Sequence, residues 1–166
     1  MSRPRTRIPL RDLKTYGRSH SVRLADFDYA SDEPMHLTIR AAAGRPFETA
    51  AIANEICASV EQCSRLCSYD LFGFTLMPDH LHVLLSPGDS GIPIRDWLRR
   101  FKSFTTNQWV RLGGQAPLWQ RSCYDHVCRN GETAESVLVY IIENPVRARL
   151  VERWKEWPWT KVFIEV

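Results

Sequence analysis

The sequence predicts an α+β fold, a ferredoxin-like antiparallel sheet with helices packed on it. Short runs of β-forming residues at positions 36–39, 69–77, 80–85 and 118–128 are interleaved with segments of helical periodicity. Only Pro78-Asp79 separates the second run from the third, which is typical of an antiparallel hairpin. The chain has 166 residues, enough for one domain with its own core. Helices alternating with antiparallel strands at this length favour the ferredoxin-like arrangement.

The first half of the chain begins with an irregular segment. Residues 1–34 are basic and then polar, so we expect an N-terminal arm followed by a single domain over residues 35–166. After the first strand and a turn at Gly44, residues 47–67 carry apolar side chains three and four positions apart. These are Ile52, Ile56, Val60, Cys63 and Cys67. This spacing predicts an amphipathic helix.

The second half repeats the alternation. Pro93 suits the first turn of a helix whose apolar stripe continues to Trp109, and Gly113-Gly114 ends it. The strand predicted at residues 118–128 follows, and residues 132–143 again have helical periodicity. An aromatic segment follows at residues 154–159, near the C-terminus.

Composition excludes several classes of protein. No run of eighteen apolar residues is present, so no transmembrane helix is expected. The arginines near the N-terminus are not followed by an apolar segment, so a secretory signal is not expected. We therefore expect the protein to reside in the cytoplasm. The five cysteines lack the spacing of a zinc ribbon, because Cys123 and Cys128 do not form a CxxC pair. We expect reduced thiols.

Positive charge is modest overall and concentrated in two places. The net charge is +3. One group lies in the N-terminal arm: Arg3, Arg5, Arg7, Arg11, Lys14 and Arg18. The other lies on the predicted helix after Pro93: Arg95, Arg99, Arg100, Lys102 and Arg111. Both groups suit phosphate contacts or a solvated surface; the two alternatives are balanced for the arm, and phosphate contact is favoured for the helix.

The most informative motif is His80-Leu81-His82 in the third predicted strand. Side chains alternate faces along a strand, so both imidazoles project from one side and Leu81 projects into the core. By the rise of a strand they are about 7 Å apart along it, close enough to share a metal ion. The alternative is a polar, exposed strand face.

Tyr140 and Asn144 form a second candidate constellation. They are four residues apart and therefore on nearly the same face of the last predicted helix, beside its apolar stripe. A carboxamide oxygen is a good ligand for a hard divalent cation, so Asn144 could complete a mixed nitrogen and oxygen site suited to Mg²⁺ or Mn²⁺. Asn144 also precedes Pro145, where a helix ends or bends, so it could instead cap the helix.

Tyr140 would be the nucleophile of such a site. A phenol has a pKa of about 10 and needs help to attack, and a nearby divalent metal can polarise a phosphate for it. The alternative for Tyr140 is a boundary tyrosine with a buried ring and a solvated hydroxyl.

The sequence around these residues resembles a known family. Three segments, residues 77–85, 119–129 and 140–151, followed by Trp157-Pro158-Trp159, are similar in order and spacing to the HUH single-tyrosine transposases, and closest to their REP-associated tyrosine transposase branch. HUH denotes two histidines around a hydrophobic residue. The resemblance spans about residues 36–160 and leaves the basic arm outside it.

The resemblance implies a function for each site residue. It implies that His80 and His82 bind Mg²⁺ or Mn²⁺, that Asn144 completes the metal site, and that Tyr140 attacks DNA to form a 5′-phosphotyrosine. It further implies the HUH endonuclease fold and a substrate of single-stranded DNA beside a hairpin. The expected protein is a metal-dependent endonuclease and strand transferase, acting as a monomer or a homodimer.

Other residues of the matched segments are each compatible with more than one function. Arg121, Arg129 and Arg147 are candidates for phosphate contact, whereas His126 suits proton transfer and a structural position equally. Trp119 and Tyr124 could stack on bases, although core packing is the commoner use. Arg149 stands where the family commonly has a glycine, which would alter the helix end or add a phosphate contact.

Two other functions are compatible with the sequence. One is a catalytically inactive binder of hairpin or single-stranded DNA, co-opted for regulation, although such a binder needs neither the histidine pair nor Tyr140. The other is a metal phosphodiesterase that activates water, with Tyr140 structural. A covalent protein–DNA adduct separates the first hypothesis from both.

Overall fold

A computed structural model describes residues 33–128 and 133–166 of the chain. Its sheet contains five strands: β1 (Met35–Arg40), β2 (Asp70–Leu76), β3 (His80–Ser86), β4 (Tyr124–Val127) and β5 (Thr160–Val162). They are arranged in the order β4-β1-β3-β2-β5, and every neighbouring pair is antiparallel. The first four strands have the order of a ferredoxin-like fold, so the predicted fold class is confirmed.

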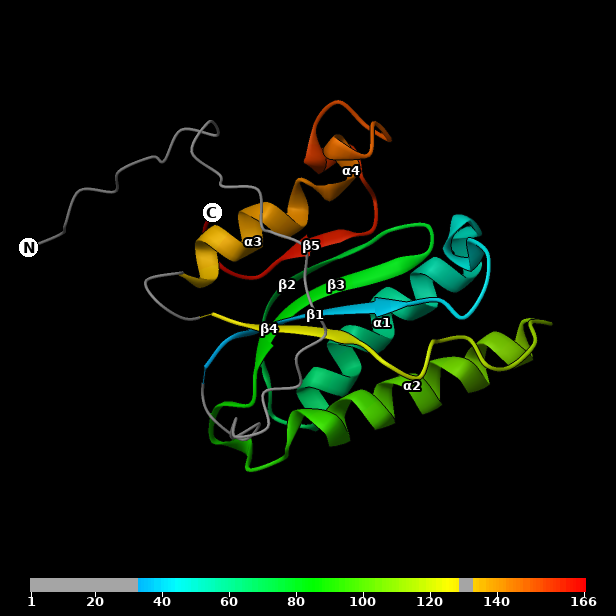
Figure 1. Cartoon of the computed structure of the whole chain (residues 1–166), viewed down its shortest axis with the longest axis horizontal. Helices are drawn as coiled ribbons and strands as arrows, with labels where there is room; N and C mark the ends of the chain where they lie inside the picture. Colours follow the sequence, from blue (N-terminus) through cyan, green and yellow to red (C-terminus); the bar gives the residue numbers. More distant parts are fainter. Residues whose placement is uncertain (1–32, 129–132) are drawn as a thin grey trace, which may run out of the picture.

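Helices cover the two faces of the sheet unequally. The helices are α1 (Ala50–Leu66), α2 (Ile94–Arg111), α3 (Ala134–Ile142) and α4 (Asn144–Arg147). Short 3-10 turns lie at Pro46–Glu48, Gly88–Ser90 and Trp154–Glu156. Helices α1 and α2 lie on one side of the sheet, and α3 crosses the other side and leads into α4 (Figure 1).

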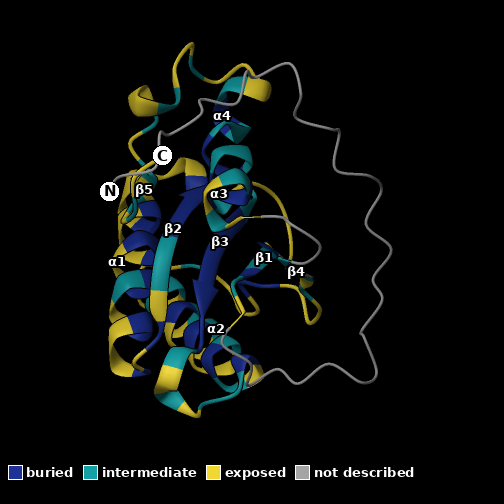
Figure 2. Cartoon of the chain, turned by 90° about the vertical axis from the view of Figure 1, so that its left-hand side faces the viewer, coloured by how far each residue is buried: buried dark blue, intermediate teal, exposed yellow. Residues whose placement is uncertain are grey.

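The face under α1 and α2 holds the main core. Strand alternation places Leu81, Val83 and Leu85 there, and each is fully buried. Trp97 and Phe101 of α2 pack against them with stacked rings whose centroids are 5.2 Å apart. In Figure 2, β3 lies between the two helical layers, and it is buried from Leu81 to Ser86.

A smaller apolar cluster holds α3 on the opposite face. Leu84 of β3 packs there against four buried residues of the helix, Val137, Leu138, Ile141 and Ile142. Gly73 makes this approach possible, because a Cβ at that position would lie 2.6 Å from Leu138 Cδ1 and 2.8 Å from the carbonyl oxygen of Lys161. The start of α3 is fixed by reciprocal hydrogen bonds between Thr133 and Ser136.

The structure differs from the sequence prediction in three elements. The strand expected over residues 118–128 is correct only for its last part, because Lys102 Nζ donates to the carbonyls of Gln120, Arg121 and Ser122 and holds them in a loop. Strand β5 and the single turn α4 were not predicted. Residues 1–32 of the arm lie outside the described residues, as do Arg129 and the side chain of His126.

Two expectations about composition can be compared with the structure. All five cysteines are free, and three of them, Cys57, Cys63 and Cys67, are buried at α1. Within residues 33–128 and 133–166, no helix has the length and apolar character needed to cross a membrane.

Candidate functional site

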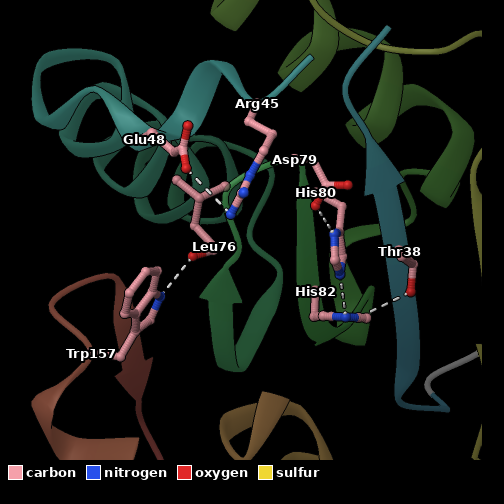
Figure 3. A network of polar contacts seen from close by, with 8 residues as sticks. All are labelled: Thr38, Arg45, Glu48, Leu76, Asp79, His80, His82 and Trp157. Carbon is pink, nitrogen blue, oxygen red and sulfur yellow. Dashed lines mark hydrogen bonds and ion pairs between the residues drawn. The ribbon is translucent and has the colours of Figure 1, made fainter. Parts of the chain in front are cut away.

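The two histidines of β3 point toward one another on the face that carries α3. The Nε2 atoms of His80 and His82 are 3.0 Å apart, and the ring of His82 is almost fully buried. Their neighbours Leu81 and Val83 lie in the main core on the opposite face, as the alternation predicted. Figure 3 shows His80 between Asp79 and His82, with Thr38 reaching His82 from β1.

Each histidine is oriented through its Nδ1 atom. His80 Nδ1 donates to Asp79 Oδ1 at 2.6 Å. His82 Nδ1 lies 3.1 Å from Thr38 Oγ1 and 2.9 Å from His36 Nε2. A metal-binding histidine commonly uses one ring nitrogen for such a partner and leaves the other for the ion. These contacts therefore direct both Nε2 atoms toward one point.

The distance between these nitrogens fits a shared divalent ion. Adjacent ligands of an octahedral ion, each about 2.1 Å from it, are separated by about 3.0 Å, which matches the separation of His80 Nε2 and His82 Nε2. Among the described residues, no group of three or more His, Cys, Asp or Glu side chains is arranged for a metal. Metal binding by the histidine pair therefore stays a prediction.

The surroundings favour the neutral form of both histidines, which is the form that binds a metal. Burial lowers the pKa of His80 below its usual value of 6.5. Burial also lowers the pKa of His82 well below 6.5, and the neighbouring imidazoles of His36 and His80 and the positive charges of Arg147 and Arg40 add to that shift.

Tyr140 lies beside this histidine cluster. It projects from α3, and its ring centroid is 6.2 Å from that of His36 in an edge-on arrangement. Arg147 holds the tyrosine from α4: its guanidinium carbon is 4.2 Å from the Tyr140 ring centroid, and its Nη2 donates to the Tyr140 carbonyl at 2.6 Å. His36 thus connects the tyrosine to His82, which it contacts directly.

Asn144 begins α4, where the chain bends after α3. Its Nδ2 donates to the carbonyls of Tyr140 and Ile141, at 3.2 and 2.9 Å, so it caps the end of α3 as the pre-proline position suggested. Both hydrogen bonds use the amide nitrogen and do not engage the carboxamide oxygen. Metal binding by that oxygen stays a prediction.

The C-terminal tryptophans fix the turn that precedes His80. Trp157 Nε1 donates to the carbonyl of Leu76 at 2.8 Å (Figure 3), and the backbone nitrogen of Leu76 donates to the carbonyl of Trp159 at 2.9 Å. Across the turn, the nitrogen of Met77 donates to the carbonyl of His80 at 2.7 Å. The aromatic segment therefore holds the end of β2 and, through it, Asp79.

The basic residues predicted on α2 do not lie near the histidines. Arg95, Arg99 and Arg100 belong to the helical layer on the opposite face of the sheet, and all three are exposed. Lys102, on the same helix, uses its ammonium to hold the loop described above. Arg121 is exposed in that loop. Phosphate contact by these residues stays a prediction.

Sequence reasoning missed four residues of the site. They are His36, Thr38, Arg40 and Asp79. The first three come from β1, where Thr38 lies directly opposite His82 and Arg40 directly opposite His80. Their alternate spacing placed them on one strand face, but their proximity to the histidines depends on β1 pairing with β3, which the strand order determines.

Arg149 ends α4 in a strained conformation. Its φ angle is 59°, in the left-handed region that favours glycine. The backbone nitrogen of Leu150 donates to the carbonyl of Pro145 and that of Arg149 to the carbonyl of Val146, the hydrogen bonds of a Schellman helix end. The arginine found where the family commonly has glycine therefore occupies a glycine-type backbone position.

Comparisons with known proteins agree with the resemblance seen in the sequence. The chain is 28% identical over 126 residues to a Haemophilus influenzae protein named as a REP-associated tyrosine transposase, covering 68% of this chain and 70% of that protein. It is also 26% identical over 95 residues to an uncharacterized protein of the same organism. That alignment covers 44% of this chain and 52% of the other protein. No family model matches the chain.

A solved structure has the same fold. It is a REP-associated tyrosine transposase bound to a REP hairpin, with a TM-score of 0.63 and 16% identity, covering 89% of this chain and 82% of that one. The expected resemblance to REP-associated tyrosine transposases is confirmed by the sequence relative, and the fold is confirmed by the structural match.

Proposed function

We propose that this relative of the REP-associated tyrosine transposases is a metal-dependent endonuclease and strand transferase of single-stranded DNA, which cleaves near hairpins through Tyr140. The placement of Tyr140 carries the proposal: its ring lies beside His36, which contacts one of two histidines aimed at a common point. The transposase name of the sequence relative supports the reaction, and the REP hairpin bound by the structural relative supports the partner.

His80, His82 and Asn144 would hold the divalent cation, Mg²⁺ or Mn²⁺. Such an ion, when bound, withdraws charge from a phosphate and stabilises the negative charge that develops on it. Asp79 and Thr38 orient the two imidazoles, and burial favours their neutral form. The histidine pair supplies nitrogen ligands, and the remaining positions stay open for oxygen atoms of the DNA.

Tyr140 supplies the nucleophile. Its hydroxyl oxygen attacks the scissile phosphorus, a bond between that oxygen and phosphorus forms, and the bond from phosphorus to the 3′ oxygen breaks. The phenolic proton ends on the 3′ oxygen, so the products are a 5′-phosphotyrosine and a free 3′-hydroxyl. Arg147 packs on one face of the ring and holds the Tyr140 carbonyl, which restricts the positions that the hydroxyl can take.

The covalent step preserves the energy of the phosphodiester bond. A 3′-hydroxyl of another DNA end can attack the phosphotyrosine, reform a phosphodiester and return the proton to Tyr140. Strand transfer then needs no ATP, because one phosphoester is exchanged for another.

Covalent trapping tests the proposal. The protein is incubated with a pool of labelled single-stranded hairpin oligonucleotides and Mn²⁺ or Mg²⁺, then separated on a denaturing gel. We expect a covalent adduct that disappears with EDTA and in Tyr140→Phe. Tyr69→Phe is the matched control, because it removes a tyrosine hydroxyl in the α1–α2 layer, where that hydroxyl donates to the carbonyl of Ile92.

Other outcomes identify the alternatives. Cleaved DNA without an adduct would replace the tyrosine mechanism with activated water. Tight hairpin binding without cleavage or adduct would assign the chain to the non-catalytic binders. An adduct that persists at full yield in Tyr140→Phe would exclude Tyr140 as the nucleophile.

A further inference from the structure

One row of side chains crosses the whole sheet on the face that carries the histidines. In strand order from β4 to β5, the residues directly opposite one another are Tyr124, Thr38, His82, Thr75 and Thr160. Thr38 contacts His82, and Thr75 Oγ1 is 3.0 Å from Thr160 Oγ1, so the members of the row share a face. The row therefore leads from the histidine site to the β4 edge of the sheet.

The β4 end of this row is open among the described residues. Helix α3 packs mainly on β2 and β3, where Leu138 covers Gly73, and its apolar cluster also includes Cys128, four residues after Tyr124. Tyr124 retains 40% of its maximal exposure there, whereas Trp119, the other aromatic candidate for base stacking, is 4% exposed and packs against Phe47 and Phe101. The structure thus separates the two: Trp119 belongs to the core and Tyr124 to the histidine face.

Arg40 adds positive charge at the same edge. It ends β1 directly opposite His80 and is exposed. Arg147 lies over Tyr140, at the end of α4. Two guanidinium groups therefore belong to the candidate active site, and the one on β1 lies two residues along the strand from Thr38, the neighbour of Tyr124.

We propose that the β4–β1 edge of this face is a nucleotide-binding lane, in which Tyr124 stacks on a DNA base and Arg40 contacts a neighbouring phosphate. The inference rests on the proposed function, because it assumes that a single strand reaches the histidines. Two strand spacings separate Tyr124 from His82, about 10 Å. This matches the reach of one nucleotide whose phosphate lies at the histidines and whose base extends toward β4.

Equilibrium binding tests the stacking contact. The full chain is titrated in EDTA, which prevents cleavage, against a fluorescein-labelled oligodeoxythymidylate, and anisotropy gives the dissociation constant. Tyr124→Ala should weaken binding about 5- to 150-fold, the range for one lost stacking contact. Tyr124→Phe should bind like the original protein, because the ring is retained. Phe104→Ala, which removes a ring of similar exposure (37%) on α2, is the control and should have no effect.

The salt dependence of the same binding tests the phosphate contact. Loss of one contact to single-stranded DNA should reduce the slope of log K against log salt by about 0.7. Arg40→Gln should show this reduction, and Arg65→Gln, an exposed arginine of α1 on the opposite side of the sheet, should not.

The outcomes distinguish this inference from the function on which it rests. If the original protein forms the covalent adduct but Tyr124→Ala binds DNA unchanged, the lane is wrong and the transposase proposal stands. Equal weakening by Tyr124→Phe and Tyr124→Ala would also overturn stacking. If the original protein neither binds the oligonucleotide nor forms an adduct with the hairpin pool, the proposed function itself fails.

Discussion

The two faces of the sheet differ in what covers them. Under α1 and α2 the strands bury a continuous apolar core that includes Trp97 and Phe101 at no measurable exposure. On the other face, among residues 33–128 and 133–166, α3 covers the part around Gly73 and Leu84, and the histidines, Thr38, Arg40 and Tyr124 lie beside it.

The difference shows how one strand can serve both stability and chemistry. Along β3, Leu81 and Val83 are buried against the first helical layer, while His80 and His82 face the other way with fixed ring orientations. A rigid sheet holds functional side chains more accurately than a loop does. We therefore expect substitutions on the first face to act on folding and substitutions on the second to act on metal and DNA binding.

The largest effect on stability should come from the face of the sheet under α1 and α2. Phe101→Ala leaves a cavity in the core and should reduce the free energy of unfolding by about 3–5 kcal/mol. Phe104→Ala, three residues along the same helix and 37% exposed, should change it by less than about 1 kcal/mol. Urea denaturation of both variants measures the difference. Similar losses would mean that α2 does not bury one face as described.

A smaller effect, confined to the metal, should come from the histidine face. Asp79→Asn removes the carboxylate that orients His80, and loss of such a partner typically weakens metal binding about 10- to 100-fold. Isothermal titration with Mn²⁺ measures the affinity, and circular dichroism checks that the fold is unchanged. Asp89→Asn, an exposed aspartate after β3, is the control. An unaltered Mn²⁺ affinity in Asp79→Asn would contradict the assigned orientation.

The pH dependence of stability should also trace to the histidine face. Burial lowers the pKa of His80 and His82 in the folded chain, whereas the unfolded chain titrates near 6.5. The unfolded state therefore binds more protons below that pH, so the stabilisation is present above 6.5 and is lost as the pH falls toward the lowered values. Denaturation midpoints of metal-free protein, measured between neutral and mildly acidic pH, should fall. A variant with asparagine at both positions should show a weaker decline; an equal decline would place the responsible groups elsewhere.

The smallest effect should be a gain at the end of α4. Arg149→Gly removes the steric cost of the left-handed backbone conformation at this position, about 1–2 kcal/mol. The greater conformational freedom of glycine in the unfolded chain offsets part of that gain. A net stabilisation of about 1 kcal/mol is expected by thermal denaturation. Ala148→Gly, one residue earlier with φ at −79°, should instead destabilise. Destabilisation by Arg149→Gly would indicate that the arginine side chain contributes more than its backbone costs.

Much of the difference between the two faces of the sheet could be predicted from the sequence, because it depends on local periodicity. The alternation around His80-Leu81-His82 assigned the two histidines to one face and Leu81 to the other, and both assignments are confirmed. The spacing of Tyr140 and Asn144 and the bend at Pro145 were likewise local signals. The bend is observed, although the residues after it form a further helical turn, α4, that was not expected.

The remaining features depend on pairing between distant segments. His36 reaches His82 only because β1 lies beside β3, and the register that aligns Thr38 with His82 is not encoded in either strand alone. Strand β5 has only three residues and follows the tryptophan segment, so no alternating pattern marked it. The charge cluster of α2 was visible in the sequence, but its position on the far side of the sheet was not.

The tyrosine mechanism is tested at its centre by identifying the residue that becomes linked to DNA. Adduct formed with hairpin oligonucleotides and Mn²⁺ is trimmed with nuclease, digested with protease and mapped by tandem mass spectrometry. If Tyr140 is the nucleophile, the mapped product is a 5′-phosphonucleotide on Tyr140, in the peptide that contains α3. Attachment at Tyr124, at another tyrosine or at a serine would contradict this assignment, because the histidine cluster would then be paired with a different nucleophile.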